Sequence, residues 1–546
     1  MATKSDSSNT AEIRVNGLRL KGLSSSQGVA RFLGIPYARV VQRFNPAQSV
    51  DLASLGSEFD ATTFGPRCPQ SWNHGPQRRK HLYEGISLSS VDPVSETDCL
   101  NLNIYSPEQT LSGIQKLPVF VWIHGGGWVF GDGGSEYDGN FLVQKASRIG
   151  KPFVFVTLNY RLGYYGFLNS RELQMEAEDN HEEYWPNLGL YDQRLALQWV
   201  QDNISHFGGD PQEVTVAGQS AGAWSALSHL VTNVPLCKRG FIMSATVISF
   251  ATERESQEIF DKLVRRTGIP HEATYQEKLA ALRSLNDDQM TKWLDGAVLI
   301  RPSWDPKWFS LLDEPSRLDQ VNCFPDWVKG LVIGSTKDET ANIKPFWQPF
   351  PAETIVNAIK SVVPDLDICD ELLKVYNMSS SSQEQLLQGL LDLTTESFFG
   401  MFPQALGELH APISVYRFEQ QDTFDESIYK GQSYHCLDLP FLYRFPAVAG
   451  PHAEAGMRAT TEVLTESVAM LVGGEMPWES FHVSRKVMVI NGQHSGLKQC
   501  PGNERWRLFS TTSARSGILV DTGRQLMTYD LAQLAQECAA GWDNRM

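Results

Sequence analysis

The chain has 546 residues, of which 42% are hydrophobic and 20% charged, and its formal net charge is -16 at pH 7. This composition is typical of a globular protein with a large core, and the acidic balance argues against nucleic acid as a partner. No run of eighteen apolar residues is present, which excludes a predicted membrane span.

The N-terminus is polar and lacks the apolar segment of a secretory signal. We therefore expect a cytoplasmic protein; the alternative is a secreted protein whose signal was removed before this numbering begins. Residues 1–11 are predicted to form a disordered tail. Residues 12–546 are predicted to form a single domain that opens with short strands at 12–22 and 29–34.

A long polar loop is predicted at residues 65–99, and it contains Cys68 and Cys99. Two interpretations stay open, a solvated surface loop or a flap over an active site. Eight cysteines in a chain of this length do not make a disulfide scaffold.

From residue 117 onward, near-continuous apolar strands alternate with helical stretches. This pattern predicts an α/β fold with a central, mostly parallel sheet that helices cover on both faces. Two long stretches, about 252–329 and 345–407, are predicted as large helical insertions. The predicted strands are 117–123, 153–158, 214–217, 241–245, 331–333, 413–418 and 487–490.

The run GQSAGA at 218–223 lies between a predicted strand and a predicted helix at 224–230. A bare G-x-S-x-G is often only a glycine-rich turn, but strand, tight turn and helix are the context of a nucleophile elbow. The glycines leave room where backbone segments crowd, and the serine sits on a strained turn at the C-terminal edge of the sheet. Ser220 is therefore the candidate nucleophile.

A second glycine run, HGGGW at 124–128, follows the strand at 117–123. The bare N–H groups of such a loop can hold an oxyanion or cradle a phosphate. No G-K-[ST] follows, so the oxyanion role is favoured. We assign the backbone N–H groups of Gly126, Gly127 and Ala221 as the oxyanion donors.

These motifs resemble those of the type-B carboxylesterase/lipase family, the cholinesterase-like branch of the α/β hydrolases. The resemblance is dense over residues 12–250 and thinner toward the C-terminus, and it implies the α/β-hydrolase fold. The matching runs are GIPYA (34–38), DCLNLNIYSP (98–107), HGGGW (124–128), NYRLGYYGF (159–167), NLGLYDQ (187–193), FGGDP (207–211) and VTVAGQSAGA (214–223).

The resemblance also implies the other two members of a catalytic triad. The family's acid lies in a run that matches GSTKDET at 334–340, which gives Glu339, and its histidine matches SYHCLDLPF at 433–441, which gives His435. Asp338 is a rival acid beside Glu339. Because adjacent side chains on an extended segment point to opposite sides, at most one of the two carboxylates is expected to face His435.

The sequence departs from the family pattern next to the nucleophile. Gln219 stands where the family often has Glu, and the missing negative charge favours neutral over cationic esters. Trp224 stands where the family commonly has a small residue after the nucleophile. Its side chain either fills space in the core or narrows the part of the site that would hold the acyl group of the ester. Gln219, Trp128 and Trp224 are the candidate residues lining the site.

The predicted loop at 65–99 also differs from the family. It lacks the family's choline-stacking tryptophan at the expected offset. The family pairs its first two cysteines, so the resemblance implies a Cys68–Cys99 disulfide, although a reducing cytosol would favour free thiols.

The implied function is that of a serine carboxylesterase that hydrolyses mainly neutral esters through an acyl-enzyme. An acyltransferase with the same triad is one alternative, and a non-catalytic adhesion or scaffold member of the family is another. No metal and no organic cofactor are implied. The expected partner is a small-molecule ester, and the protein is expected to be a monomer or a homodimer.

Overall fold

A computed structural model describes residues 10–70, 79–83, 86, 93–113, 116–293, 300–311, 317–363, 365–378 and 382–500 of the chain. Within these residues, one large sheet runs through the molecule with the strand order β1-β2-β3-β7-β9-β8-β10-β11-β12-β13-β14-β15, and β6 pairs with β2. The strands are β1 (Thr10–Val15), β2 (Leu18–Ser24), β3 (Val29–Pro36), β6 (Glu58–Asp60), β7 (Asn101–Pro107), β8 (Leu117–Ile123), β9 (Val154–Leu158), β10 (Gly209–Gln219), β11 (Arg239–Met243), β12 (Gly330–Thr336), β13 (Ile413–Phe418), β14 (Lys486–Ile490) and β15 (Gly496–Gln499).

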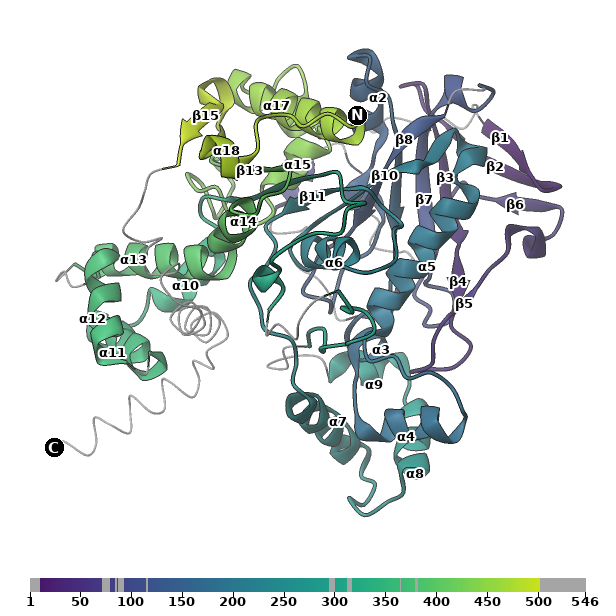
Figure 1. The fold of residues 1–546 in the computed structure, drawn as a ribbon, viewed down its shortest axis with the longest axis horizontal. Helices are drawn as coiled ribbons and strands as arrows, with labels where there is room; N and C mark the ends of the chain where they lie inside the picture. Colours follow the sequence, from purple (N-terminus) through teal and green to yellow (C-terminus); the bar gives the residue numbers. More distant parts are fainter. Residues whose placement is uncertain are drawn as a thin grey trace.

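The central strands of the sheet, from β9 to β14, are parallel to one another. Antiparallel pairs flank them, with β1, β2, β3 and β7 on one side and β15 on the other. In Figure 1 the purple N-terminal strands lie at the right edge of the sheet and β15 lies at the opposite edge. Because parallel strands end at the same edge, the segments after β8, β10 and β12 come together there.

Helices cover both faces of the sheet, because β8 is apolar on both sides. Val119 and Val121 belong to one hydrophobic core, whereas Phe120 and Trp122 belong to the other. Successive strand residues point to opposite faces, so the two cores lie on opposite sides of the sheet. Helices α5 (Leu188–Asn203) and α6 (Ala221–Leu230) contribute to the first core, and α2 (Asn140–Arg148) and α17 (Ala455–Val472) to the second.

Two groups of helices project from this framework, one toward the bottom and one toward the left of Figure 1. The first contains α4 (Arg171–Asp179), α7 (Glu253–Thr267), α8 (Tyr275–Arg283) and α9 (Asp287–Lys292). The second contains α10 (Lys344–Trp347), α11 (Ala352–Val362), α12 (Leu366–Val375), α13 (Gln383–Thr395), the π-helical turn η8 (Glu396–Gly400) and α14 (Met401–Gly407). Further short helices are α3 (Gly163–Phe167), α15 (Asp438–Leu442), α16 (Pro446–Ala449) and α18 (Phe481–Ser484).

The predicted N-terminal tail ends earlier than the sequence suggested. Thr10 and Ala11 are part of β1 and pair with Leu23 and Gly22 of β2, because an edge strand can extend wherever a partner strand offers backbone groups. Residues 1–9 lie outside the described residues. The division into one domain stays a prediction. Among the described residues, no helix is long and apolar enough to cross a bilayer.

Candidate active site

Ser220 lies between the end of β10 and the start of α6. Its backbone dihedrals are φ +59° and ψ -126°, a left-handed region that a non-glycine residue rarely adopts. Its N–H donates to the carbonyl of Met243, 2.9 Å away at the end of β11, which holds the turn against the neighbouring strand. The predicted strand, strained turn and helix are therefore all present around this serine.

Gly222 shows why this turn needs glycines. A Cβ atom added to Gly222 would lie 2.1 Å from the carbonyl oxygen of Ile123, the last residue of β8. Any side chain would therefore push α6 away from the sheet and displace Ser220. The close approach also brings the start of α6 next to the loop that follows β8.

The predicted oxyanion loop follows β8 directly. Gly126 has φ +104°, and a Cβ atom there would lie 2.0 Å from the carbonyl oxygen of Phe130, so only glycine fits. Within the described residues, the backbone N–H groups of Gly126, Gly127 and Ala221 donate to no protein acceptor. Three N–H groups that remain free beside a nucleophile are what an oxyanion site requires.

Glu339 and His435 form a buried pair. The Nδ1 atom of His435 donates to Oε2 of Glu339 over 2.5 Å, and the backbone N–H of Thr336 donates to Oε1 over 2.7 Å. The carboxylate is fully buried, whereas the imidazole side chain is 23% exposed. The acid is thereby fixed at both oxygens, and it selects the tautomer in which Nε2 is free to accept a proton.

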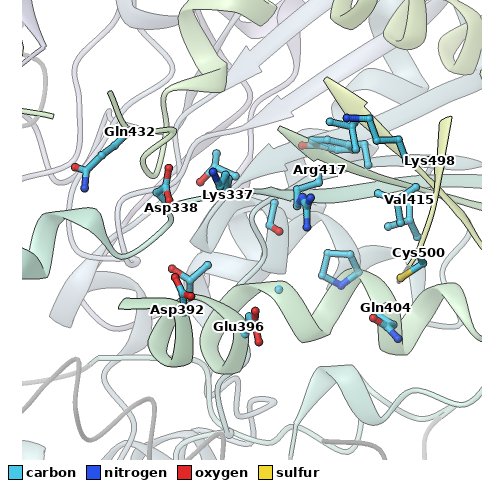
Figure 2. Close-up of a pocket in the computed structure, with 18 of the residues that line it drawn as sticks. Lys337, Asp338, Asp392, Glu396, Gln404, Val415, Arg417, Gln432, Lys498 and Cys500 are labelled. Carbon is cyan, nitrogen blue, oxygen red and sulfur yellow. The ribbon is translucent and has the colours of Figure 1, made fainter. Parts of the chain in front are cut away.

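Asp338 faces away from this pair. Its Oδ2 accepts from the N–H of Ser433 over 2.8 Å. Asp338 and Lys337 line a cavity of about 790 Å³ between the sheet and the helices α13 and α14. Figure 2 shows Asp338 and Lys337 at this cavity, opposite Asp392 and Glu396. Neither Ser220 nor Glu339 nor His435 lines this cavity, so it is separate from the candidate triad.

The protonation of His435 depends on opposing influences. Burial lowers its pKa, but the neighbouring Cys436 and Glu339 outweigh burial and raise the pKa well above 6.5. Because the Glu339 carboxyl group is in direct contact with the imidazole, we regard it as the main cause of the increase. Asp438 lies close by, and burial together with the charge of Glu339 raises its pKa to about 7.

No hydrogen bond joins Ser220 Oγ to His435 among the described residues. The neighbouring Gln219 reaches the imidazole instead, with its Nε2 atom 3.1 Å from Nε2 and 3.4 Å from Nδ1 of His435. Catalytic hydrogen bonds are often long in free enzymes and tighten when substrate binds. The arrangement can support proton transfer from a serine to a histidine backed by a carboxylate.

The two candidate lining tryptophans lie beneath the elbow. Trp128 and Trp224 are 3% and 1% exposed, and their rings meet edge to face at 5.6 Å. Trp224 also packs against Phe250 and Phe309. Trp224 thus fills space in an aromatic cluster, and its contact with the candidate triad is a backbone hydrogen bond to the carbonyl of Ser220, whereas Gln219 contacts His435 through its side chain.

Sequence reasoning missed Phe399, whose ring packs 4.8 Å from the imidazole of His435. Phe399 lies in η8, within the second group of helices. Arg79 lies in the segment predicted as a surface loop or flap at 65–99, and it donates to the carbonyl oxygen of Cys436 over 3.3 Å, a contact that the sequence does not specify. No motif marks either residue, because each is brought to the site by a distant segment of the chain.

The implied Cys68–Cys99 disulfide is not present. Both residues are buried free thiols. The side chain of Cys68 raises the pKa of Cys99, as does burial, so the two side chains are in contact without a covalent bond. The structure therefore supports the predicted proximity but not the bond. No group of His, Cys, Asp or Glu among the described residues is arranged to hold a metal ion.

Comparisons with known proteins agree with this geometry. A sequence model described as the carboxylesterase family matches residues 5–472. The chain is 30% identical to the para-nitrobenzyl esterase of Bacillus subtilis (strain 168) over 448 residues, which are 78% of this chain and 81% of that protein. It is 31% identical to carboxylesterase 1F of Mus musculus over 463 residues, 76% of each protein.

Other matches cover different shares of the chain. Lipase 2 of Diutina rugosa is 34% identical over 294 residues, so the match spans about half the length of each protein, 50% of this chain and 51% of that lipase. A solved structure titled PNB esterase is similar with a TM-score of 0.68 and 24% sequence identity, covering 93% of this chain and 99% of that one. This likeness confirms the predicted α/β-hydrolase fold.

Proposed function

Since this chain belongs to the carboxylesterase family, a family of carboxylic ester hydrolases, we propose that it is a serine carboxylesterase that acts on mainly neutral esters through an acyl-enzyme. The observation that carries the proposal is the contact of His435 with Glu339 beside the strained turn of Ser220. The nucleophile Ser220, the acid Glu339 and the base His435 follow one another in the chain order that α/β hydrolases use.

In the proposed mechanism, Ser220 Oγ attacks the ester carbonyl and His435 Nε2 takes the hydroxyl proton. The ionised Glu339 holds the imidazole and stabilises the imidazolium that forms. The N–H groups of Gly126, Gly127 and Ala221 stabilise the oxyanion. His435 then protonates the leaving alcohol, and a water molecule activated by the same histidine releases the acid.

The preference for neutral esters is supported by the residue before the nucleophile. Gln219 is 2% exposed and brings an uncharged amide to His435. A cationic alcohol would find no carboxylate there to attract it. Hydrolysis of an acetylated choline should therefore show no kcat/KM advantage over an uncharged acetate ester of equal size. A clear advantage for the cation would contradict the proposed preference.

Labelling of the serine tests the mechanism itself. A fluorophosphonate probe should label the wild-type protein at Ser220, and Ser220→Ala should abolish labelling and reduce ester turnover to the level that binding and oxyanion donors alone support. Ser228→Ala, on the same helix, is the matched control and should be labelled normally. Normal turnover by Ser220→Ala would refute the assignment. Cellular location and oligomeric state stay predictions.

A further inference from the structure

The contact between Gln219 and His435 has an unusual geometry. The amide nitrogen lies at nearly equal distances from the two ring nitrogens, 3.1 Å from Nε2 and 3.4 Å from Nδ1. An amide lying in the plane of the ring and bonded to one nitrogen would be much further from the other. The amide therefore approaches the face of the imidazole, while the Nε2 lone pair, which lies in the ring plane, stays available.

The amide is also fixed in place. Gln219 is the last residue of β10 and pairs with Met243 of β11. Its other amide atom lies beside the oxyanion loop, because a Cβ atom on Gly125 would be 3.2 Å from Gln219 Oε1. The side chain is thus wedged between that loop and the catalytic histidine, with almost no contact with solvent.

We propose that Gln219 is a positioning residue that holds the imidazole by its face and keeps negative charge away from it. This inference rests on the proposed esterase function. The amide clamps the ring against Glu339 without occupying the lone pair that Ser220 needs. Because it is neutral, it also favours release of the proton from the imidazolium, whereas a carboxylate in the same place would retain it.

The charged and titratable groups around His435 make this neutrality important. Glu339 contacts Nδ1 directly, Cys436 is the next residue, and Asp438 lies one turn along in α15. Arg79 directly precedes the 3-10 helix η2 (Lys80–Tyr83) and donates to the carbonyl oxygen of Cys436. One ionised carboxylate already supports the imidazolium, and a second would make it a weaker acid still.

Two variants of Gln219 separate the effect of charge beside His435 from the effect of holding the imidazole in position. The rate of labelling by a neutral fluorophosphonate is measured from pH 5 to pH 9 for the wild type, Gln219→Glu and Gln219→Met. Gln219→Glu should move the acid limb of the profile to higher pH by about one to three units. Gln219→Met keeps the length of the side chain without the amide; it should leave the limb in place and lower the plateau rate several-fold.

A second buried glutamine provides the control. Gln193 contacts His229 through Oε1 over 3.1 Å, away from the triad residues. Gln193→Glu carries the same cost of a buried charge, and its acid limb should coincide with that of the wild type. If the limb of Gln219→Glu does not move, or if Gln219→Met keeps the full plateau rate, the proposal is overturned. An inert wild type with no labelling of Ser220 would instead refute the proposed function.

Discussion

Two buried acid–base pairs, Glu339 with His435 and Arg161 with Asp192, lie in different parts of this molecule. Arg161 follows β9, Asp192 lies on α5, and both side chains are 1% exposed. The guanidinium donates to both carboxylate oxygens, over 2.8 Å and 2.7 Å, and Nη1 donates to the carbonyl of Asn45. The backbone N–H of Arg161 also donates to the carboxylate. This pair leaves little hydrogen-bonding capacity unused.

The triad pair is incomplete by comparison. Glu339 is satisfied at both oxygens, but the amide of Gln219 over the ring face leaves the Nε2 lone pair of His435 available, and the imidazole is partly exposed. Both pairs come from segments that the sequence marks as family motifs. The difference teaches that a buried pair is structural when all of its hydrogen-bonding groups have partners. Such a pair can be reactive when one of its members remains able to exchange a proton.

The largest expected effect comes from breaking the reactive pair. Glu339→Gln removes the charge that supports the imidazolium and disturbs the orientation of the ring, so turnover should fall by about 10⁴-fold. Folding should be largely intact, because the amide keeps the shape of the side chain. Steady-state kinetics on one ester, with thermal melts of the same samples, checks both parts.

Asp338→Asn is the matched control for that variant. Asp338 is the adjacent acid, but it accepts from Ser433 N–H and lines the cavity between the sheet and the helices α13 and α14. Its loss should change turnover much less than the loss of Glu339. If the asparagine variant is the inactive one, the acid has been assigned to the wrong residue.

Breaking the Arg161–Asp192 pair should lower the stability of the fold and leave the turnover of the folded protein unchanged. Arg161→Met leaves Asp192 buried without its partner, which should cost about 3 to 5 kcal/mol of the free energy of unfolding. The fraction that remains folded should keep its kcat. Denaturant titration with active-site titration of the folded protein measures both. Replacing both residues together, with Asp192→Leu added, should recover part of the loss; a double variant as unstable as the single one would contradict this.

The sequence predicted the parts of this site that depend on local patterns. Apolar strands and glycine runs located the strained turn at Ser220 and the glycine loop after β8, because the requirements of these segments are set by a few adjacent residues. The alternation of side chains separated Asp338 from Glu339, although only the family resemblance named Glu339 as the acid. These features are encoded within single segments of the chain.

Other features depend on contacts between distant segments. Gln219 and His435 are 216 positions apart, and no periodicity in either segment reveals that the amide meets the ring face. Phe399 reaches the site only through the placement of the second helix group. The pairing of Arg161 with Asp192 is also invisible in the sequence, where the two residues belong to two separate runs that match the family. Packing decides these contacts, and local propensity does not.

A third carboxyl group, that of Asp438, sharpens the comparison between buried groups that have all their hydrogen-bond partners and buried groups that lack them. It is fully buried beside Glu339, and among the described residues neither of its oxygens has a hydrogen-bond partner. Burial and the charge of Glu339 raise its pKa from 3.8 to about 7. It is therefore neutral in the folded protein over a range where the unfolded chain would ionise it.

This shift has a definite consequence for stability. Between pH 3.8 and about pH 7 the folded state retains a proton that the unfolded state has released, so Asp438 lowers the stability as the pH rises through this window. The lost stability is complete above about pH 7, where it amounts to roughly 4 kcal/mol at about 1.4 kcal/mol per pKa unit.

Asp438→Asn, which cannot ionise, should be increasingly stabilised relative to the wild type from pH 4.5 to pH 8. Melting temperatures of both proteins at pH 4.5, 6 and 8 measure the difference, with the exposed Asp425→Asn as a control that should show no such increase. A difference that stays constant across these pH values would mean that Asp438 ionises normally in the folded protein, and that the group beside the triad is solvated.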